Sequence, residues 1–426
     1  MSRSQASRII RLKVLSLLIS LSGIPFSVTA GQKNWSVDLS AYDLGAGHEN
    51  ASRSRKPTIL VAATNGVVAV AWGRPAHPAG PGEVDKWLSG PWEVTLLLFD
   101  ASSGKLKAKR GPWSSGFSFE LYPTAQGNFL LFLRRSHDVK QTPGETLYLL
   151  SSSAEELKKL DLLPSIRHSR AEWNSFLVSS SGGTVLLGQS DEGVVHYKLL
   201  ESDTLETKFE WTREPGSDSP GIVALSDKKL LGFRNPENQE KPRRADSARD
   251  VYVRSFDGPW HPLNATLDVS SHGGIGQGLH PTQLAFLSDT ALVGVYAKQQ
   301  EQEGSIVVLQ SNGTILSPPV IPKLPERTSL TGPVTVSAGG RYFAVGFQHQ
   351  PLMSHLLVDV MTMDMTFWND DSLFLVWELS SPEPVARIPI GTDVRAVSFS
   401  PDDPPTLIFV TGSKLQVIRI QPKAKP

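Results

Sequence analysis

Residues 58–72 read Thr58-Ile-Leu-Val-Ala-Ala-Thr-Asn-Gly-Val-Val-Ala-Val-Ala-Trp72. Two apolar runs flank Asn65-Gly66, and this dipeptide favours a tight reversal because both residues tolerate positive φ. The segment therefore predicts a β-hairpin. Because both runs are apolar almost throughout, we expect strands that are covered on both faces.

The same unit of apolar strand, polar turn and apolar strand recurs six more times, with first strands near residues 119, 175, 222, 284, 334 and 394. A third apolar strand follows each pair. Most units add a more polar fourth strand, for example Lys105–Lys109, Thr207–Trp211 and Val385–Ile390. The pattern predicts an all-β, seven-bladed β-propeller. The rival folds are a six- or eight-bladed ring and a two-sheet sandwich, but a sandwich is not expected to repeat one four-strand unit seven times.

The seventh unit ends at Ile420 without a fourth strand. Near the N-terminus, Trp35-Ser-Val-Asp-Leu39 is a spare strand. We expect this strand to pair with Leu415–Ile418 and to close the ring, which leaves no open edge at that position.

Composition limits the partners and the compartment. Lys plus Arg and Asp plus Glu are 42 each, so the net charge is zero, which argues against nucleic acid or an anionic membrane as a partner. The chain has no cysteine, so disulfides, thiolate metal sites and a lipid-modified cysteine are excluded. The absence of disulfides favours a bacterial periplasmic or secreted protein over a eukaryotic extracellular one.

The first thirty residues have the pattern of an export signal. Basic residues precede a short apolar run, Val14–Ile24, and Val28-Thr-Ala30 supplies the small residues of a cleavage site. The run is too short to span a bilayer core of ~30 Å. The sequence therefore predicts a signal peptide at 1–30 and one propeller domain at 31–426, with no membrane span after cleavage.

The last two strands of the sixth unit and the start of the seventh carry a family resemblance. The chain reads Leu373-Phe-Leu-Val-Trp-Glu-Leu-Ser-Ser-Pro-Glu-Pro-Val-Ala-Arg-Ile-Pro-Ile390 and then Val394-Arg-Ala-Val-Ser-Phe-Ser-Pro-Asp-Asp403. This segment resembles the junction of two blades in the WD40-like and YVTN-type bacterial β-propeller families. Trp377-Glu378 is only a near match to their Trp-Asp dipeptide. The resemblance implies a recognition scaffold, although the fold alone does not choose one function.

Long inserts separate the second and third strands of five units. They are Arg74–Glu93, Arg135–Glu145, Asn235–Asp250, Lys298–Ser305 and Gln348–Ser372. In antiparallel four-strand blades, these links all emerge on one face, and long loops on a rigid scaffold are where binding usually lies. The alternative is that they are tolerated surface loops without a role, because such insertions cost little stability.

Two inserts supply the candidate binding residues, which are Trp87, Trp92, His349, His355, Met361, Met363, Met365 and Trp368. Exposed tryptophans could stack on a sugar or anchor a partner, although more often they fold back on the adjacent blade. For the methionine-rich insert, packing within a long hairpin is the favoured interpretation, and contact with a partner is the second. Thioether and imidazole ligands also suit Cu(I), but a copper site is the least favoured interpretation, and we predict neither metal nor cofactor.

No catalytic constellation stands out. His272-Gly-Gly resembles the oxyanion loop of lipases, but the Gly-X-Ser-X-Gly partner is missing. The sequence therefore favours a secreted or periplasmic, non-enzymatic scaffold that binds a protein or cell-surface glycan through the insert-bearing face. The alternative is a propeller hydrolase or lyase, for which carboxylates, histidines or a metal should converge at the central channel.

Overall fold

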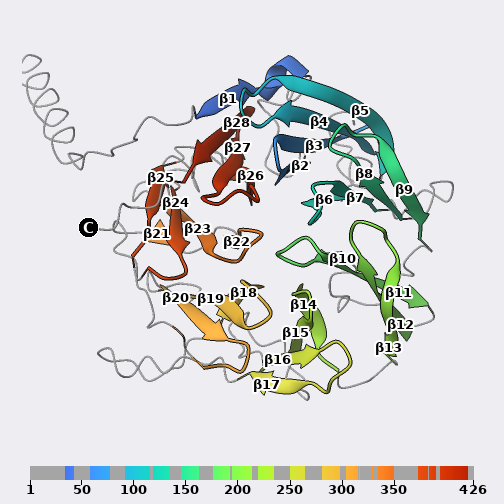
Figure 1. Ribbon diagram of the computed structural model, residues 1–426, viewed down its shortest axis with the longest axis vertical. Helices are drawn as coiled ribbons and strands as arrows, with labels where there is room; N and C mark the ends of the chain where they lie inside the picture. Colours follow the sequence, from blue (N-terminus) through green and yellow to red (C-terminus); the bar gives the residue numbers. More distant parts are fainter. Residues whose placement is uncertain are drawn as a thin grey trace, which may run out of the picture. The chain divides into compact units, whose positions relative to one another are not determined.

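The structure is a computed structural model that describes residues 34–42, 58–76, 92–115, 119–134, 145–162, 176–191, 194–213, 219–234, 250–263, 281–297, 304–314, 316, 328–329, 334–349, 373–381, 383–389 and 394–420. All of them belong to one compact unit, Asn34–Pro426. Their strands form seven separate antiparallel sheets that surround a central axis as blades (Figure 1). The prediction of a seven-bladed β-propeller is confirmed.

The strands are numbered along the chain, and each blade is given from its innermost strand outward. Blades 1 and 2 are β2 (Thr58–Thr64), β3 (Val67–Pro75), β4 (Trp92–Asp100), β5 (Leu106–Ser115), and β6 (Phe119–Pro123), β7 (Phe129–Leu133), β8 (Thr146–Leu150), β9 (Glu156–Asp161). Blades 3 and 4 are β10 (Phe176–Val178), β11 (Thr184–Asp191), β12 (Val194–Glu201), β13 (Thr207–Arg213), and β14 (Gly221–Leu225), β15 (Lys229–Arg234), β16 (Asp250–Ser255), β17 (His261–Leu263).

Blades 5 and 6 depart from the four-strand pattern, and blade 7 takes its outer strand from the N-terminus. Blade 5 has three described strands, β18 (Pro281–Phe286), β19 (Ala291–Ala297) and β20 (Gly304–Gln310). Blade 6 has its inner position in two pieces, β21 (Thr328–Ser329) and β22 (Val334–Val336), which both pair with β23 (Tyr342–His349), followed by β24 (Leu373–Glu378) and β25 (Ala386–Pro389). Blade 7 is β26 (Val394–Phe399), β27 (Thr406–Thr411), β28 (Lys414–Arg419) and β1 (Trp35–Asp38).

The first hairpin forms as the sequence predicts. β2 pairs with β3 from Thr58 opposite Gly73 to Thr64 opposite Val67. Gly66 lies in the reversal with φ of 80°, a conformation that costs glycine little because it has no Cβ.

The core is divided among the contacts between neighbouring blades. Seven hydrophobic clusters of described residues each join two adjacent blades. In β4, Leu97 and Phe99 belong to the cluster shared with blade 7, whereas Leu96 and Leu98 belong to the cluster shared with blade 2. Alternate side chains of one strand thus enter different clusters, which is why these strands are apolar throughout.

The N-terminal strand closes the ring. β1 pairs with β28 from Trp35 opposite Val417 to Asp38 opposite Lys414, as expected. Leu39 begins a short 3-10 helix, η1 (Leu39–Tyr42), and is fully buried. The Trp35 indole Nε1 donates to the Ala101 carbonyl at 2.7 Å, so this segment also joins blade 7 to blade 1.

Candidate functional site

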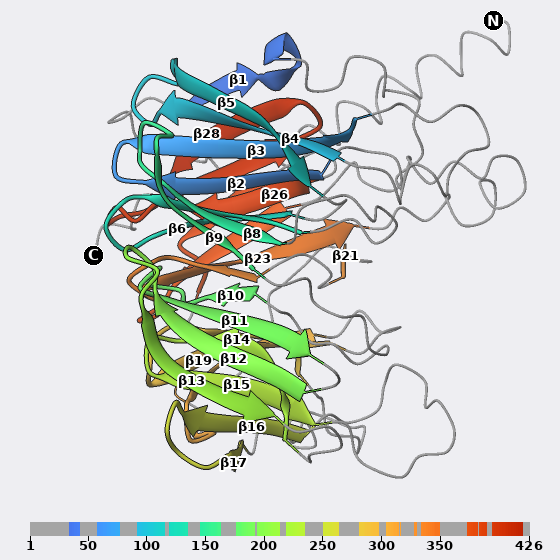
Figure 2. The ribbon, with the colours of Figure 1, turned by 90° about the vertical axis from the view of Figure 1, so that its right-hand side faces the viewer.

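The links between second and third strands all leave the ring on one side. Paired residues mark the place in each blade where the link begins and ends: Pro75 and Trp92, Leu133 and Thr146, Asp191 and Val194, Arg234 and Asp250, Ala297 and Gly304, Phe347 and Leu373, and Thr411 and Lys414. We call this side the insert face. The turns between first and second strands lie on the opposite side, the turn face, and Figure 2 shows the β2–β3 turn and the paired ends of β3 and β4 at opposite sides of the ring.

The strands extend further into the inserts than the sequence suggests. Arg74 and Glu93 still face each other across β3 and β4 and form an ion pair at 3.1 Å. Gln348 and His349 pair with β21. Polar side chains continue these strands, so the end of the apolar run does not mark the end of the strand. The three longest inserts are therefore narrower than expected, at 76–91, 235–249 and 350–372.

Two of the predicted binding residues fall within the described strands. Trp92 is the first residue of β4 and is only 2% exposed. A Cβ added at Gly73 would lie 3.1 Å from the Trp92 ring. This placement fits a tryptophan that folds back on its own blade. His349 is the last residue of β23 and faces Thr328 in β21.

The other candidates, Trp87, His355, Met361, Met363, Met365 and Trp368, lie outside the described residues. Their binding roles stay predictions.

A cavity of about 550 Å³ occupies the centre of the ring, and the innermost strands of all seven blades line it. Its described walls combine apolar side chains such as Leu60, Leu177 and Val223 with polar groups such as Thr124 and Ser179. A space of this volume is within the range of small-molecule pockets.

Glu120 is the single charged side chain among the described residues that line this cavity. Its carboxylate accepts hydrogen bonds from Arg134 and, at 3.1 Å, from the Tyr122 hydroxyl. Burial, followed by the charge of Glu120, raises the pKa of Tyr122, so the hydroxyl stays protonated as a donor. In the described part of the chain, no three His, Cys, Asp or Glu side chains gather as a metal site would need.

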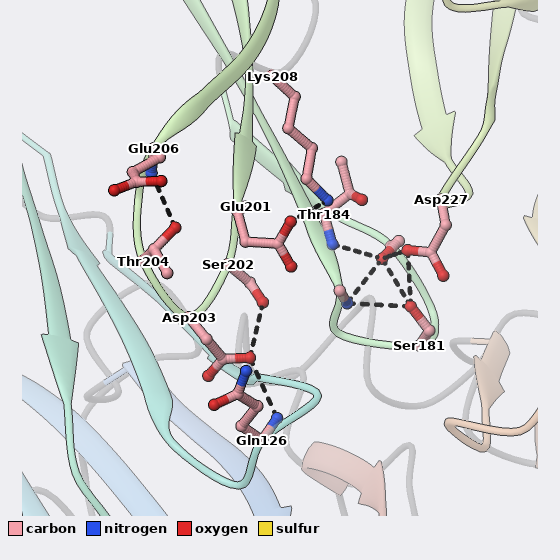
Figure 3. A network of polar contacts seen from close by, with 12 residues as sticks. Gln126, Ser181, Thr184, Glu201, Ser202, Asp203, Thr204, Glu206, Lys208 and Asp227 are labelled. Carbon is pink, nitrogen blue, oxygen red and sulfur yellow. Dashed lines mark hydrogen bonds and ion pairs between the residues drawn. The ribbon is translucent and has the colours of Figure 1, made fainter.

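On the turn face, aspartates connect neighbouring blades (Figure 3). Asp203, in the β12–β13 turn of blade 3, accepts hydrogen bonds from the β6–β7 turn of blade 2. The donors are the Thr124 hydroxyl, the Gln126 backbone N–H at 3.1 Å and the Asn128 amide at 3.1 Å. This contact is partly buried and fixes two blades at their turns.

The same arrangement recurs at the next two junctions. Asp227 of blade 4 accepts hydrogen bonds from Ser179 and Ser181 of blade 3, both at 2.7 Å. Asp289 of blade 5 accepts from the Lys228 N–H of blade 4 at 3.0 Å.

Blades 6 and 7 are joined by an ion pair between Arg341 and Asp403, at 2.7 Å. Sequence reasoning missed these contacts, because an acid in a turn is ordinarily read as a local cap. Their trace in the sequence is an aspartate in the first turn of units four, five and seven, Asp227, Asp289 and Asp403, whereas Asp203 lies in the second turn of unit three.

These observations define the protein as a seven-bladed β-propeller with one loop-bearing face and one face fixed by contacts between turns. The architectural resemblance to WD40-like propellers is confirmed, while the motifs remain weak. No family model and no curated protein matches the chain. Among the described residues, no helix is long and apolar enough to cross a membrane, and the predicted signal peptide lies outside them.

Solved structures provide remote similarities. The β-propeller domain of the Trilobed protease from Pyrococcus furiosus is 9% identical, with a TM-score of 0.46, 85% of this chain covered and 96% of that chain. An acylaminoacyl peptidase from Pyrococcus horikoshii is 10% identical, with a TM-score of 0.47. The match covers 84% of this chain and 49% of that chain. TolB from Acinetobacter baumannii is 14% identical, with a TM-score of 0.38. The match covers 70% of this chain and 60% of that chain. At these identities the similarity concerns the fold alone.

Proposed function

We propose that the protein is an exported, non-enzymatic recognition scaffold that binds a protein or a cell-surface glycan through its insert face. The observation that carries this proposal is the difference between the two faces. Links at 76–91, 235–249 and 350–372 start from paired strand ends on the insert face. The turn face consists of short reversals, and Asp203, Asp227 and Asp289 in these turns accept hydrogen bonds from a neighbouring blade.

The ring suits recognition because it holds the loop bases at fixed positions. Seven hydrophobic clusters fix each blade to the next, and turn-face aspartates add contacts at four of these junctions. A rigid base lowers the cost of ordering on binding. Trp87 and Trp368 are the candidate anchors within the inserts, since large rigid side chains give contact area at low entropy cost. Buried Trp92 is better explained as packing.

Export by the signal peptide at 1–30 places the domain in the periplasm or outside a bacterial cell, with Gly31 as the first mature residue. Sequencing the N-terminus of the exported protein tests this part of the proposal. The hydrolase or lyase alternative has less support, because the single described carboxylate in the channel wall, Glu120, is already bound by Arg134 and Tyr122.

The test replaces 350–372 with a short glycine-containing turn. We expect the propeller to fold with nearly the same midpoint of thermal unfolding, because blades 3 and 7 already join the equivalent strands through short links at 192–193 and 412–413. The amount of partner that the variant captures from an envelope extract, measured by cross-linking, should fall.

The matched control is Asp257→Ala, an exposed position in the β16–β17 turn, which should capture as the parent does. Unchanged capture by the loop variant would show that this insert is not part of the site. Failure to fold would mean that the methionine-rich insert belongs to the core.

A further inference from the structure

The outer strand of blade 1 carries a row of exposed cations. β5 has ten residues and is the longest of the described strands. Lys107, Lys109 and Arg110 on this strand, and Lys105 just before it, are all exposed. We call these four residues the basic stripe. No described strand pairs with the outer edge of β5, which lies at the periphery of the ring (Figure 1).

The basic stripe has no acidic neighbour in the sequence. Between Asp100 and Glu120 the chain has no Asp or Glu. Asp100 itself is engaged in its own turn, where one carboxylate oxygen accepts from the backbone N–H and the hydroxyl of both Ser102 and Ser103 at 2.6 to 3.1 Å. These hydrogen bonds lower the pKa of Asp100 to about 2. No ion pair of the described residues involves a member of the stripe.

The equivalent strands of the next two blades are different. On β9, Lys159 pairs with Asp161 at 2.9 Å. In blade 3, Lys198 pairs with Glu210 on β13 at 3.2 Å, and Lys208 of β13 pairs with Glu201. On these two outer strands Lys159 and Lys208 each have an acidic partner, and Lys158 donates to the Thr204 carbonyl at 2.6 Å, whereas no described ion pair involves the cations on β5.

Lysines on an edge strand commonly serve to prevent pairing with another chain. β5 already has that protection. Its register with β4 shifts at Lys107, the extra residue between the Leu98–Ala108 and Phe99–Leu106 pairs, and shifts again at Gly111-Pro112. Bulges interrupt the ladder, and proline has no N–H to donate. Four unbalanced cations thus exceed what edge protection requires.

An apolar side chain, Leu106, follows Lys105 in the chain. Its pairing with Phe99 puts it on the same face of β5 as Lys109, which pairs with Leu97, whereas Arg110 pairs with Leu96 and lies on the other face. A partner that meets both faces must therefore lie along the outer edge of the strand.

Leu106 is 39% exposed, one of the few large hydrophobic side chains of the described surface that is open to solvent. A leucine among cations suits a partner that combines carboxylates with apolar side chains, which is a peptide. A uniformly charged polymer would leave the leucine unused. From Lys105 to Arg110 the stripe spans ~17 Å at ~3.3 Å per residue, about the length of five extended residues.

We propose that the basic stripe binds an acidic, extended segment of a partner protein. This surface lies on the outer strand of blade 1 and is separate from the insert face, so the inference goes beyond the proposed function. Exposed ion pairs are individually weak and are screened by salt. Binding through the stripe must therefore weaken as the salt concentration rises.

The test measures fluorescence anisotropy of a labelled synthetic decapeptide that alternates glutamate and serine around one central leucine. The parent should bind it at about 20 mM salt and lose at least about tenfold in affinity at about 200 mM. The variant K105Q/K107Q/K109Q/R110Q should lose at least about tenfold at low salt. K107Q/K109Q should show an intermediate loss, which keeps the test valid if the quadruple variant is unstable.

The matched control is K198Q/K208Q, which neutralises two lysines that already have acidic partners and should change the affinity by less than about twofold. Leu106→Ser should weaken binding in the parent background, and the variant with 350–372 replaced should bind the peptide as the parent does.

The proposal is overturned if the parent does not bind the peptide or if the quadruple variant binds as well as the parent. It is also overturned if Leu106→Ser has no effect, or if heparin or phosphatidylglycerol vesicles bind more tightly than the peptide, because the occupant would then be a glycan or a membrane. Loss of peptide binding on replacement of 350–372 would move the site to the insert face.

Discussion

Leu205 combines an unfavourable backbone conformation with a buried side chain. Its φ of 52° lies in the left-handed region, which costs a non-glycine residue about 1–2 kcal/mol. Gly104 adopts φ of 68° in the corresponding turn of blade 1, and both N–H groups donate to the carbonyl four residues earlier. Leu205 is 4% exposed within the cluster between blades 2 and 3. Burial of a leucine contributes about 1.5–3 kcal/mol and offsets the strain.

This balance predicts that Leu205→Gly is more stable than Leu205→Ala, the reverse of the order expected at an unstrained position. Leu205→Ala loses the packing and keeps the strain, so it should lower the free energy of unfolding by about 2–4 kcal/mol. Leu205→Gly loses the same packing but relieves the strain, so its loss should be smaller by about 1 kcal/mol. Urea unfolding of both variants measures the difference. A glycine variant less stable than the alanine variant would show that the conformation is not strained.

At the scale of elements, the turns on one face hold the blades together. Asp203 accepts hydrogen bonds from three groups of the blade 2 turn. Asp203→Ala should therefore destabilise the protein by about 2 kcal/mol, because partly buried donors lose an ionised acceptor. Asp257→Ala, in an outer turn of blade 4, should change stability by less than about 0.5 kcal/mol. Equal midpoints of chemical unfolding for the two variants would mean that the contact between blades contributes nothing.

The elements that could be predicted from the sequence are those determined by residues close together in the chain. The hairpin at Asn65-Gly66 follows from residues adjacent in the chain, and its pairing is as expected. The ends of β3 and β4 could not be predicted, because Arg74 and Glu93 are polar and their pairing depends on the facing strand. The first insert was located correctly, but its length was overestimated for that reason.

Contacts between units were harder to predict than the units themselves. Asp203 is ordinary as a turn residue, and only the ring places it beside Gln126 and Asn128. Net charge does not report position either, since a total of zero does not show that Lys107, Lys109 and Arg110 gather on one strand. Both features depend on the position of a strand in its blade, which composition does not report.

At the scale of the whole molecule, stability depends on β1. Trp35 and Leu39 join the last blade to the first through the Ala101 carbonyl and the shared hydrophobic cluster. Removal of the chain before Ala41 exposes the edge of β28 and should open the ring, which lowers the thermal midpoint and promotes aggregation. Size-exclusion chromatography and thermal unfolding check this outcome.

A milder variant separates the two contributions of that segment. Trp35→Ala keeps the β1–β28 pairing but removes the indole from Ala101 and Gly104. We expect a loss of about 2 kcal/mol without aggregation, below the range for a fully buried tryptophan because Trp35 is only partly buried. A truncated protein that stays monomeric with the parental midpoint would contradict the closing role of β1.

The β1–β28 pairing also sets the time at which the molecule can finish folding. The Asp38 carboxylate accepts from the Ser413 hydroxyl, 375 residues away in the chain. Ribosomes add about 5–20 residues per second, so the first-made strand waits on the order of twenty seconds or more for its partner. During that interval the most recently made blade has a neighbouring blade on one side only. On the proposed export route, this delay would help to keep the chain in a translocation-competent state until its last blade has been made.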